Sequence, residues 1–308
     1  MQNKFTHALN WRIKKTLNPL NKWRWFLIDY FDFSKKESVE KISLIVVGRN
    51  DNYGGNFSKR LETTLDWNLS IIPNSELIYV EWNQIKEKAS DCDWISKRYS
   101  NSYCYIVPKE IHNQITVNSK MPVMEYFAKN IGIRKSKTDW ILLVNADVLI
   151  GLDVAKNIKK LNTNTIYGTH YINIMWNENK IDTKYLKNKR IIESKYACGA
   201  SLKAKVGNFI LTNKKNWIKA TGYDETLINE RLGVDDNGLE QLMVSKYKQR
   251  VIGHHYHLDH SESFIHGLNE THGTNTFNNV PYKNKDDWGH INYPLKQISE
   301  RIWELKQI

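Results

Sequence analysis

The chain has 308 residues, enough for one large α/β domain or two small ones, and its 41 % hydrophobic and 25 % charged residues are typical of a soluble protein with a core. Its 45 Lys and Arg exceed its 33 Asp and Glu, which indicates either an anionic partner or lysine-rich solvated faces. Its 3 cysteines lack metal-ligand spacing and fit a reducing, cytoplasmic compartment. No run approaches the roughly 20 apolar residues of a membrane span, and no signal-peptide pattern is present.

Residues 1–40 differ in composition from the rest of the chain. Residues 1–28 contain no Asp or Glu, but basic residues alternate there with apolar ones that include Trp11, Trp23 and Trp25. Basic, tryptophan-rich amphipathic segments can lie at an anionic membrane surface. We interpret residues 1–40 as an N-terminal extension that either makes the protein peripheral to a membrane or docks on the main domain.

From residue 41 onward, short β-branched runs alternate with amphipathic segments. The predicted strands are 42–47, 77–81, 103–107 and 140–144, and the predicted helices are 57–67 and 122–137. Pro122 suits the first turn of the second helix. This alternation predicts an α/β fold, a single Rossmann-like domain over residues 41–308 with a mostly parallel central sheet and helices on both faces.

Such sheets bind ligands beyond the carboxyl ends of their strands. The polar residues that directly follow the predicted strands are therefore the first candidates for a site: Arg49, Asn50 and Asp51; Glu81 and Asn83; Asn145 and Asp147.

The second half of the chain is less regular. We predict strands at 206–211 and 251–257, helices at 214–220, 235–247 and 292–306, and a polar loop over 259–290. No repeat and no Pro, Gly or Ser-rich linker divides this half from the first.

Asp147 is the strongest candidate for a metal ligand. Five apolar residues, 140–144, run directly into Asn145-Ala146-Asp147 and place the carboxylate at the carboxyl edge of the sheet. Hard divalent cations such as Mn²⁺ or Mg²⁺ take oxygen ligands and commonly bridge a carboxylate to substrate phosphates. Asp147 would hold the cation, with Asn145 as a weaker ligand or a nucleotide contact. An ordinary turn is the alternative.

Residues 125–136, with Asn130 and Gly132, resemble the helix that precedes the DxD-type strand in family-2-like GT-A glycosyltransferases. Residues 45–51 look like the first strand and base-binding loop of that family, and 77–83 like its second strand. The resemblance implies a GT-A fold in which residues 41–150 bind a nucleotide sugar. The donor-binding residues that it implies are Arg49, Asn50, Asp51, Glu81, Asn83, Asn130, Arg134 and Asn145.

The same resemblance extends to residues 207–240 and makes 151–308 the acceptor half. The turn Gly222-Tyr223-Asp224-Glu225 is similar to the acceptor side of these enzymes, which implies acceptor binding by Trp217, Tyr223 and Asp224. Asp235 and Asp236 match the acidic pair that opens a helix in the family. The resemblance makes Asp236 the general base, with Asp235 as the alternative; either could instead cap the helix.

A run of histidines at 254–260 is a second candidate metal site. In a strand over 251–257, His255 and His257 would point to the same side, as two ligands of one metal require. Some GT-A enzymes add a histidine in this region to the metal shell. The alternative is a polar lining of the acceptor site.

The predicted function is therefore metal-assisted transfer of a sugar, from a UDP-sugar by preference, to a hydroxyl of a glycan or glycolipid, with inversion. Lys129 and Arg134 are candidates to offset charge on the departing diphosphate. One alternative is nucleotidyl transfer onto a sugar phosphate, but residues 49–55 lack a glycine-rich phosphate loop. The other is a basic nucleic-acid-binding protein, for which no zinc finger or RNA-binding strand signature is present.

Overall fold

The computed structural model describes residues 36–72, 74–117, 121–175, 208–227, 238, 241–242, 248–260 and 283–307. The chain divides into two compact units, Met1–Glu37 and Ser38–Ile308. Nearly all described residues belong to the second unit, so the extension predicted over residues 1–40 lies almost wholly outside them. None of the described helices is long and apolar enough to cross a membrane.

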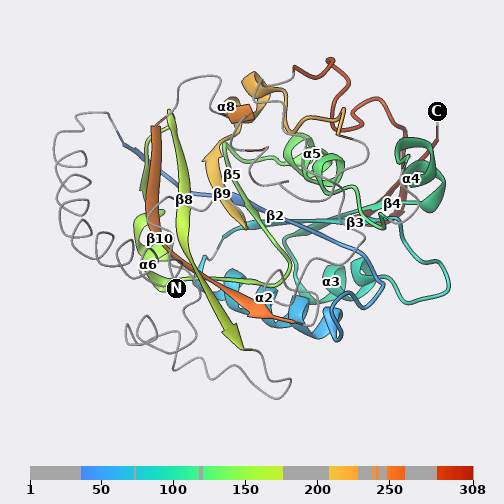
Figure 1. Ribbon diagram of the computed structural model, residues 1–308, viewed down its shortest axis with the longest axis horizontal. Helices are drawn as coiled ribbons and strands as arrows, with labels where there is room; N and C mark the ends of the chain where they lie inside the picture. Colours follow the sequence, from blue (N-terminus) through green and yellow to red (C-terminus); the bar gives the residue numbers. More distant parts are fainter. Residues whose placement is uncertain are drawn as a thin grey trace, which may run out of the picture. The chain divides into compact units, whose positions relative to one another are not determined.

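The described part of the second unit is built on a ten-stranded mixed sheet with the order β11-β12-β4-β3-β2-β5-β9-β8-β10-β6 (Figure 1). Five neighbouring strands form its parallel part: β12 Ile302–Leu305, β4 Ser102–Val107, β3 Glu76–Trp82, β2 Ile42–Gly48 and β5 Trp140–Val144. Four of them, β2, β3, β4 and β5, confirm the strands predicted in the first half of the chain.

The sheet continues beyond β5 with mostly antiparallel neighbours. They are β9 Phe209–Asn213, β8 Thr165–Met175, β10 Lys248–Asp259 and β6 Val148–Ile150, while β11 Leu295–Ser299 lies at the opposite edge. Within this group only β8 and β10 are parallel to each other. Two short strands, β1 Glu37–Ser38 and β7 Lys160–Leu161, lie outside the large sheet.

Helices cover both faces of the sheet, as predicted (Figure 1). One face carries α2 Phe57–Ile71 and α3 Asp91–Arg98, and the other carries α5 Glu125–Lys135 and α8 Lys214–Ala220. Two further short helices are α4 Lys109–Ile115 and α6 Leu152–Asn157. The predicted helix 235–247 lies outside the described residues except for residues 238, 241 and 242.

The strand β5 shows why the sheet needs both helical layers. Leu142 and Val144 pack into the cluster beneath α2, whereas Ile141 and Leu143 pack into the cluster beneath α5. Successive strand residues point to opposite faces, so a strand that is apolar throughout is buried on both sides. The polar segment Asn145-Ala146-Asp147 therefore follows directly where the buried strand β5 ends.

The prediction of a helix over 292–306 is wrong, because this segment forms the hairpin of β11 and β12. Ile302 packs into the core cluster on one face of the sheet, and Trp303 and Leu305 pack into the cluster on the other. Trp303 also stacks on Tyr105, with ring centroids 5.5 Å apart. The backbone of β12 pairs with the edge of β4. As a strand of the sheet, β12 buries side chains on both faces, which a helix at this edge could not do.

Candidate functional site

Three side chains that could bind a metal meet at the carboxyl end of β5. Asp147 follows β5 in the chain, His257 lies on β10, and His260 directly follows β10. The backbone carbonyl of Asp147 accepts a hydrogen bond of 2.8 Å from Leu258 N, and Val148 is paired with His257 across β6 and β10. The sheet itself therefore holds the two histidines beside the carboxylate.

The distances within the Asp147–His257–His260 cluster are short enough for one ion to bridge the three side chains. Asp147 Oδ2 lies 3.1 Å from His260 Nε2 and 3.5 Å from His257 Nε2. One potential ligand atom from each residue lies within 4.8 Å of the other two. Both histidines are buried, and the carboxylate is largely shielded from solvent.

The charge of Asp147 is stabilised by its histidine neighbours. Burial acts to raise the pKa of this carboxyl, but the charges and hydrogen bonds of His257 and His260 outweigh it and lower the pKa below the ordinary value. Asp147 Oδ1 is buried and has no hydrogen-bond partner among the described residues. An ionised carboxylate with one open oxygen, beside two imidazoles, fits a divalent cation that keeps further positions for another ligand.

The loop before α2 closes one side of this cluster. Gly54 has a φ of 62°, and a Cβ at this position would lie 2.4 Å from His260 Nδ1. The ring of Tyr53 meets His260 edge-on at a centroid distance of 5.0 Å. Buried Arg60 donates to the carbonyls of Tyr53, Gly54 and Gly55, so its guanidinium fixes the loop against the histidine.

His255 is not part of the cluster, which corrects the prediction that it binds metal together with His257. Its Nδ1 lies 2.6 Å from Thr169 Oγ1, and its ring stacks parallel to Phe209 at 6.3 Å. His255 is fully buried, two residue pairs away from His257 along the ladder of β10 and β6. His260 takes the place that the prediction gave to His255.

Arg49, Asp51 and Asn83 come together at the ends of β2 and β3, as their positions after the strands predicted. Arg49 Nη1 pairs with Asp51 Oδ2 at 2.9 Å, and Arg49 Nε donates to the carbonyl of Asn83 at 2.8 Å. Asn83 has a φ of 53°, and its side-chain nitrogen donates to Pro122 O. Its Oδ1 is buried without a hydrogen-bond partner in the described part of the chain.

Asn50 and Glu81, predicted to bind the donor, serve the fold. The Asn50 amide bonds to the backbone of residues 85–89, with 2.8 Å from Ile85 N to Oδ1. Glu81 has no exposed surface, and its carboxylate accepts from Ser90 Oγ at 2.5 Å and Asp91 N at 3.1 Å. Glu81 is thus a buried cap of the α3 N-terminus, and direct contact between its carboxylate and a nucleotide base is excluded in this conformation.

Lys129 and Asn145 form a polar pair at the end of β5. The Lys129 ammonium lies 2.8 Å from Glu125 Oε1 and 3.3 Å from Asn145 Oδ1, and its side chain is nearly fully buried. Asn145 also donates to Asn208 Oδ1 at 3.0 Å. The Lys129 ammonium of α5 thus contacts Asn145, which precedes Asp147 by two positions at the carboxyl end of β5.

Asn130 and Arg134 on α5 hold the segment 283–290, not the strand ends. The Asn130 amide exchanges hydrogen bonds with the backbone of Tyr223 and donates to Glu225 Oε1 at 2.8 Å. Arg134 donates to Asp286 O, and its guanidinium lies 4.6 Å from the ring centre of Trp288. The fully buried Asn130 amide therefore has a structural role in place of the predicted donor contact.

Trp217 and Tyr223 lie in the core, which corrects their prediction as stacking platforms for an acceptor. Neither has exposed surface, and their rings stack on each other at 4.9 Å. Asp224 is also buried, and its Oδ1 accepts from Thr226 N and Oγ1. Asp235 and Asp236 lie outside the described residues, so the prediction of a general base stays a prediction.

His260 is the one member of the cluster that sequence reasoning missed. The alternation of side chains along a strand selects residues two apart, and it paired His255 with His257. His260 follows His257 by three residues and lies just past the end of β10. The density of histidines at 254–260 was the only available signal, since the position of His260 depends on the pairing of β6 with β10.

No protein-family model matches the sequence, and no match was found among curated proteins. Solved structures that are similar to the chain include a mannosyltransferase, the S. aureus protein TarS and the glycosyltransferase GlyE. One is the mannosyltransferase PcManGT from Pyrobaculum calidifontis in complex with GDP-Man and Mn²⁺, with 11 % identity, 83 % of this chain and 70 % of that chain covered, and a TM-score of 0.46. Another is TarS of S. aureus, with 14 % identity, 74 % and 38 % covered, and a TM-score of 0.44.

A third structure is the glycosyltransferase GlyE of Streptococcus pneumoniae, with 14 % identity, 69 % of this chain and 45 % of that chain covered, and a TM-score of 0.37. The chain thus spans less than two thirds of the length of TarS and GlyE.

Proposed function

We propose that the chain is a metal-assisted glycosyltransferase of the hexosyltransferase type. It would move a sugar from a nucleotide sugar, with UDP favoured as the nucleotide, to a hydroxyl of a glycan or glycolipid in polysaccharide biosynthesis. The observation that carries the proposal is the Asp147–His257–His260 cluster at the carboxyl end of β5, where one Asp147 oxygen has no partner among the described residues.

The position of the cluster in the sheet supports binding of a nucleotide diphosphate. Parallel α/β sheets bind their ligands at the carboxyl ends of the strands, and β2, β3 and β5 end side by side. Arg49 and Asp51 follow β2, Asn83 follows β3, and Asp147 follows β5. In this proposal Arg49, Asp51 and Asn83 contact the base and ribose, and the cation at Asp147 contacts the diphosphate.

Each residue has a distinct role in the proposed reaction. Asp147, His257 and His260 would hold a divalent cation, Mn²⁺ or Mg²⁺, which stabilises negative charge on a diphosphate leaving group. Lys129, whose charge is paired with Glu125, adds a hydrogen-bond donor beside Asn145 at the end of the same strand. Asp236, or its neighbour Asp235, would accept the proton of the acceptor hydroxyl as that oxygen attacks the anomeric carbon, which inverts the configuration.

A panel of UDP- and GDP-sugars tests the proposal. Thermal unfolding and sugar release are measured with and without Mn²⁺ or Mg²⁺, on the wild type and on Asp147→Asn. We expect one nucleotide to raise the melting temperature only when the metal is present, and this rise to disappear in the variant. A ligand that binds only the folded state stabilises it by an amount that grows with the logarithm of its concentration divided by its Kd, so the nucleotide that gives a shift identifies the base.

Asp153→Asn is the matched control, because Asp153 also pairs with a histidine, at 2.5 Å from His254 Nδ1, but lies outside the cluster. Asp153→Asn should respond to metal and nucleotide as the wild type does. Equal losses in both variants, or no response of the wild type to any nucleotide sugar, would contradict the proposal.

Residues 1–40 carry a separate part of the proposal, which is peripheral attachment to an anionic membrane. It is supported by the acid-free, tryptophan-rich sequence of residues 1–28. Deletion of residues 1–38 should abolish sedimentation with phosphatidylserine-containing vesicles and leave donor hydrolysis intact. Unchanged vesicle binding of the shortened chain would contradict it.

A further inference from the structure

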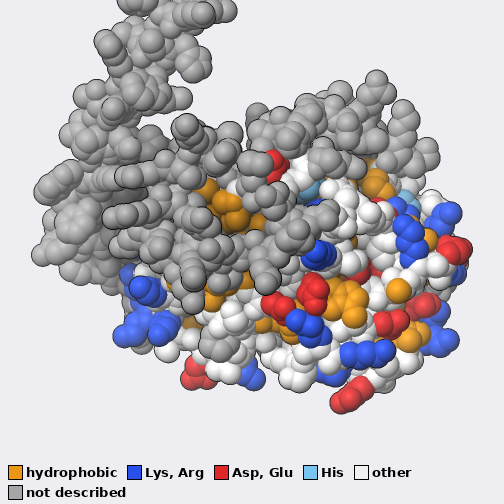
Figure 2. Space-filling model, turned by 90° about the horizontal axis from the view of Figure 1, so that it is seen from below, with side chains coloured by type: hydrophobic (Ala, Val, Ile, Leu, Met, Phe, Trp, Pro, Cys, Tyr) orange, Lys and Arg blue, Asp and Glu red, His pale blue; other side chains and the backbone are white. Residues whose placement is uncertain are grey.

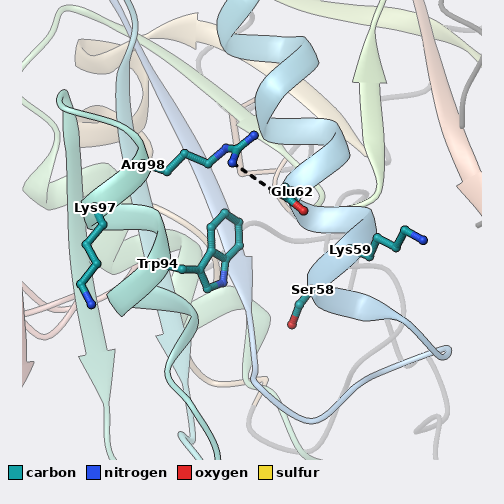
Figure 3. Close-up of a pocket in the computed structure, with 6 residues that line it drawn as sticks. All are labelled: Ser58, Lys59, Glu62, Trp94, Lys97 and Arg98. Carbon is teal, nitrogen blue, oxygen red and sulfur yellow. Dashed lines mark ion pairs between the residues drawn. The ribbon is translucent and has the colours of Figure 1, made fainter. Parts of the chain in front are cut away.

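A groove lies between the outward faces of α2 and α3 (Figure 3). Its volume is about 550 Å³, within the range of small-molecule sites. The lining residues are Ser58, Lys59, Glu62, Trp94, Lys97 and Arg98. None of them has a role in the site described above.

The helix α2 separates this groove from the metal-capable cluster. Thr64 lies on the buried face of α2, and its hydroxyl donates to Ala146 O at 2.6 Å, next to Asp147. Lys59 and Glu62 lie on the outward face of the same helix. A ligand in the groove would therefore be separate from a donor bound at the strand ends.

Ion pairs fix the geometry of the groove. Arg98 on α3 donates to both oxygens of Asp66 on α2, at 2.9 and 2.7 Å, and pairs with Glu62 at 3.2 Å. This fork between two carboxylates neutralises Arg98 and clamps the two helices together. Arg98 thus contributes to the shape of the groove more than to its charge.

Trp94 provides an aromatic surface between the two helices (Figure 3). Its indole N–H donates to Asp91 Oδ1 at 3.0 Å, and Ser58 Oγ donates to the same oxygen at 3.2 Å. The ring is partly buried against the core and partly exposed. Because its polar atom is already bonded, what the ring offers a ligand is its flat apolar surface.

Lys59 and Lys97 supply the charge of the groove. They are exposed, lie at its opposite sides in Figure 3, and form no ion pair with any residue that the structure describes. Two ammonium groups that form no ion pair with a described residue flank the aromatic surface, and suit a ligand that combines a flat apolar ring face with acidic groups. A sugar ring with carboxylate or phosphate substituents has this combination.

The surface around the groove argues against a nucleic acid. Figure 2 looks onto the side of the sheet covered by α2 and α3, and there the described acidic side chains are mixed with the basic ones. Glu62 and Asp66 lie beside the groove itself. An extended phosphate backbone needs a continuous basic face, whereas a short acidic saccharide needs only the two lysines.

We propose that the groove between α2 and α3 binds an acidic saccharide, with a sugar ring on Trp94 and anionic groups on Lys59 and Lys97. The proposal goes beyond sugar transfer, and binding can be measured in the absence of donor and metal.

Calorimetric titration of the full chain tests the proposal with three tetrasaccharides: a hexuronate, a phosphodiester-linked hexose and a neutral hexose. We expect one of the two acidic ligands to bind, and its identity distinguishes carboxylate from phosphate as the anionic group. Binding should weaken as salt is added. Failure of both acidic ligands, equal binding of the neutral one, or tighter binding of a single-stranded oligonucleotide would overturn the proposal.

Two pairs of variants locate the binding. The double variant Lys59→Gln/Lys97→Gln should bind about tenfold more weakly, because each substitution removes an exposed ion pair with the ligand. Lys156→Gln with Lys159→Gln changes the net charge by the same amount at exposed positions outside the groove, and should leave affinity unchanged. Equal losses in the two double variants would mean that only the overall charge matters, and would overturn the assignment to the groove.

Trp94→Phe and Trp94→Leu test the aromatic surface while each keeps an apolar side chain against the core. Trp94→Phe should retain most of the binding and Trp94→Leu should lose most of it. Thermal unfolding of both variants shows that they are folded. Equal affinity of the two would overturn the role of Trp94.

Discussion

His260 Nε2 lies 3.1 Å from Asp147 Oδ2, although 113 positions separate the two residues in the chain. The contact depends on two strands: β5 ends just before Asp147, and β10 ends just before His260. The pairing of β6 with β10 brings the two ends together. The metal-capable cluster is thus a consequence of sheet topology, and its three members can be tested separately.

Replacement of His260 by Gln should weaken binding of Mn²⁺ at least about tenfold, because one ligand of the cluster is lost. His255→Gln is the matched control, since it makes the same change five positions earlier at a residue bonded to Thr169. Electron paramagnetic resonance of free Mn²⁺ measures both affinities. A larger loss in His255→Gln than in His260→Gln would restore the ligand pair predicted from the sequence and contradict the cluster.

Gly54→Ala should also weaken metal binding, through the loop that covers His260. A Cβ at Gly54 would lie 2.4 Å from His260 Nδ1 and would push the ring away from Asp147. Gly55→Ala is the control: its φ of 70° is as unfavourable for alanine as the 62° of Gly54, but a Cβ there meets nothing within 4 Å. Both variants should lose about 1–2 kcal/mol of unfolding free energy, and only Gly54→Ala should lose Mn²⁺ affinity.

Urea unfolding together with Mn²⁺ titration separates the two effects. Equal Mn²⁺ affinity of the two alanine variants would show that the loop does not position His260.

The elements that the sequence predicted well are those whose signals are local. The strands β2, β3 and β5 are mainly apolar, because both of their faces are buried. The helix α8 was predicted with its observed bounds, since Asn213 directly before it caps Lys215 N. Asp147 could be predicted as a candidate for the same reason, because the end of a buried strand is visible in the sequence.

The features that the sequence did not reveal depend on long-range pairing. Leu295, Ile298, Ile302 and Leu305 have a spacing that a helix also satisfies, and only the free edge of β4 makes the segment a hairpin. Glu81, near the end of β3, has the same sequence signal whether it faces a ligand or caps α3. Its burial decides between the two, and burial follows from the placement of α3.

Glu81→Gln should therefore affect stability and leave nucleotide binding unchanged. The amide would turn an N–H₂ group toward donors that now bond to the carboxylate, namely Ser90 Oγ and the backbone N–H groups of Asp91 and Cys92. Leaving such groups unpaired in the core costs about 1–3 kcal/mol. Urea unfolding measures this cost, and titration with the nucleotide identified by the donor panel measures affinity.

The control for Glu81→Gln is Glu110→Gln, which removes an exposed ion pair with Lys86 and should cost less than about 1 kcal/mol. Normal stability of Glu81→Gln combined with a loss of nucleotide affinity would reinstate Glu81 as a donor-binding residue.

Glu225 should make the stability of the protein depend on pH between about 4.5 and 7. Burial raises the pKa of its carboxyl to about 7, despite hydrogen bonds from Asn130 Nδ2 and Gly289 N that act in the opposite direction. Below the unfolded value of 4.5, both states hold the proton and the group has no effect. Between the two values the unfolded chain ionises first, so the free energy of unfolding falls as the pH rises, and above about 7 the loss is complete.

Glu225→Gln should remove this fall, because a neutral amide can accept the same two hydrogen bonds through its oxygen at every pH. The contribution of Glu225 to the fall is about 3 kcal/mol, from the size of the pKa shift. Urea unfolding at pH 4.5, 6 and 8 should therefore show that the free energy of unfolding of the variant increases relative to that of the wild type as the pH rises. Glu300→Gln, at an exposed glutamate, should follow the wild type throughout. If the stability of Glu225→Gln also followed that of the wild type at every pH, a group other than Glu225 would be responsible for any fall in stability over this range.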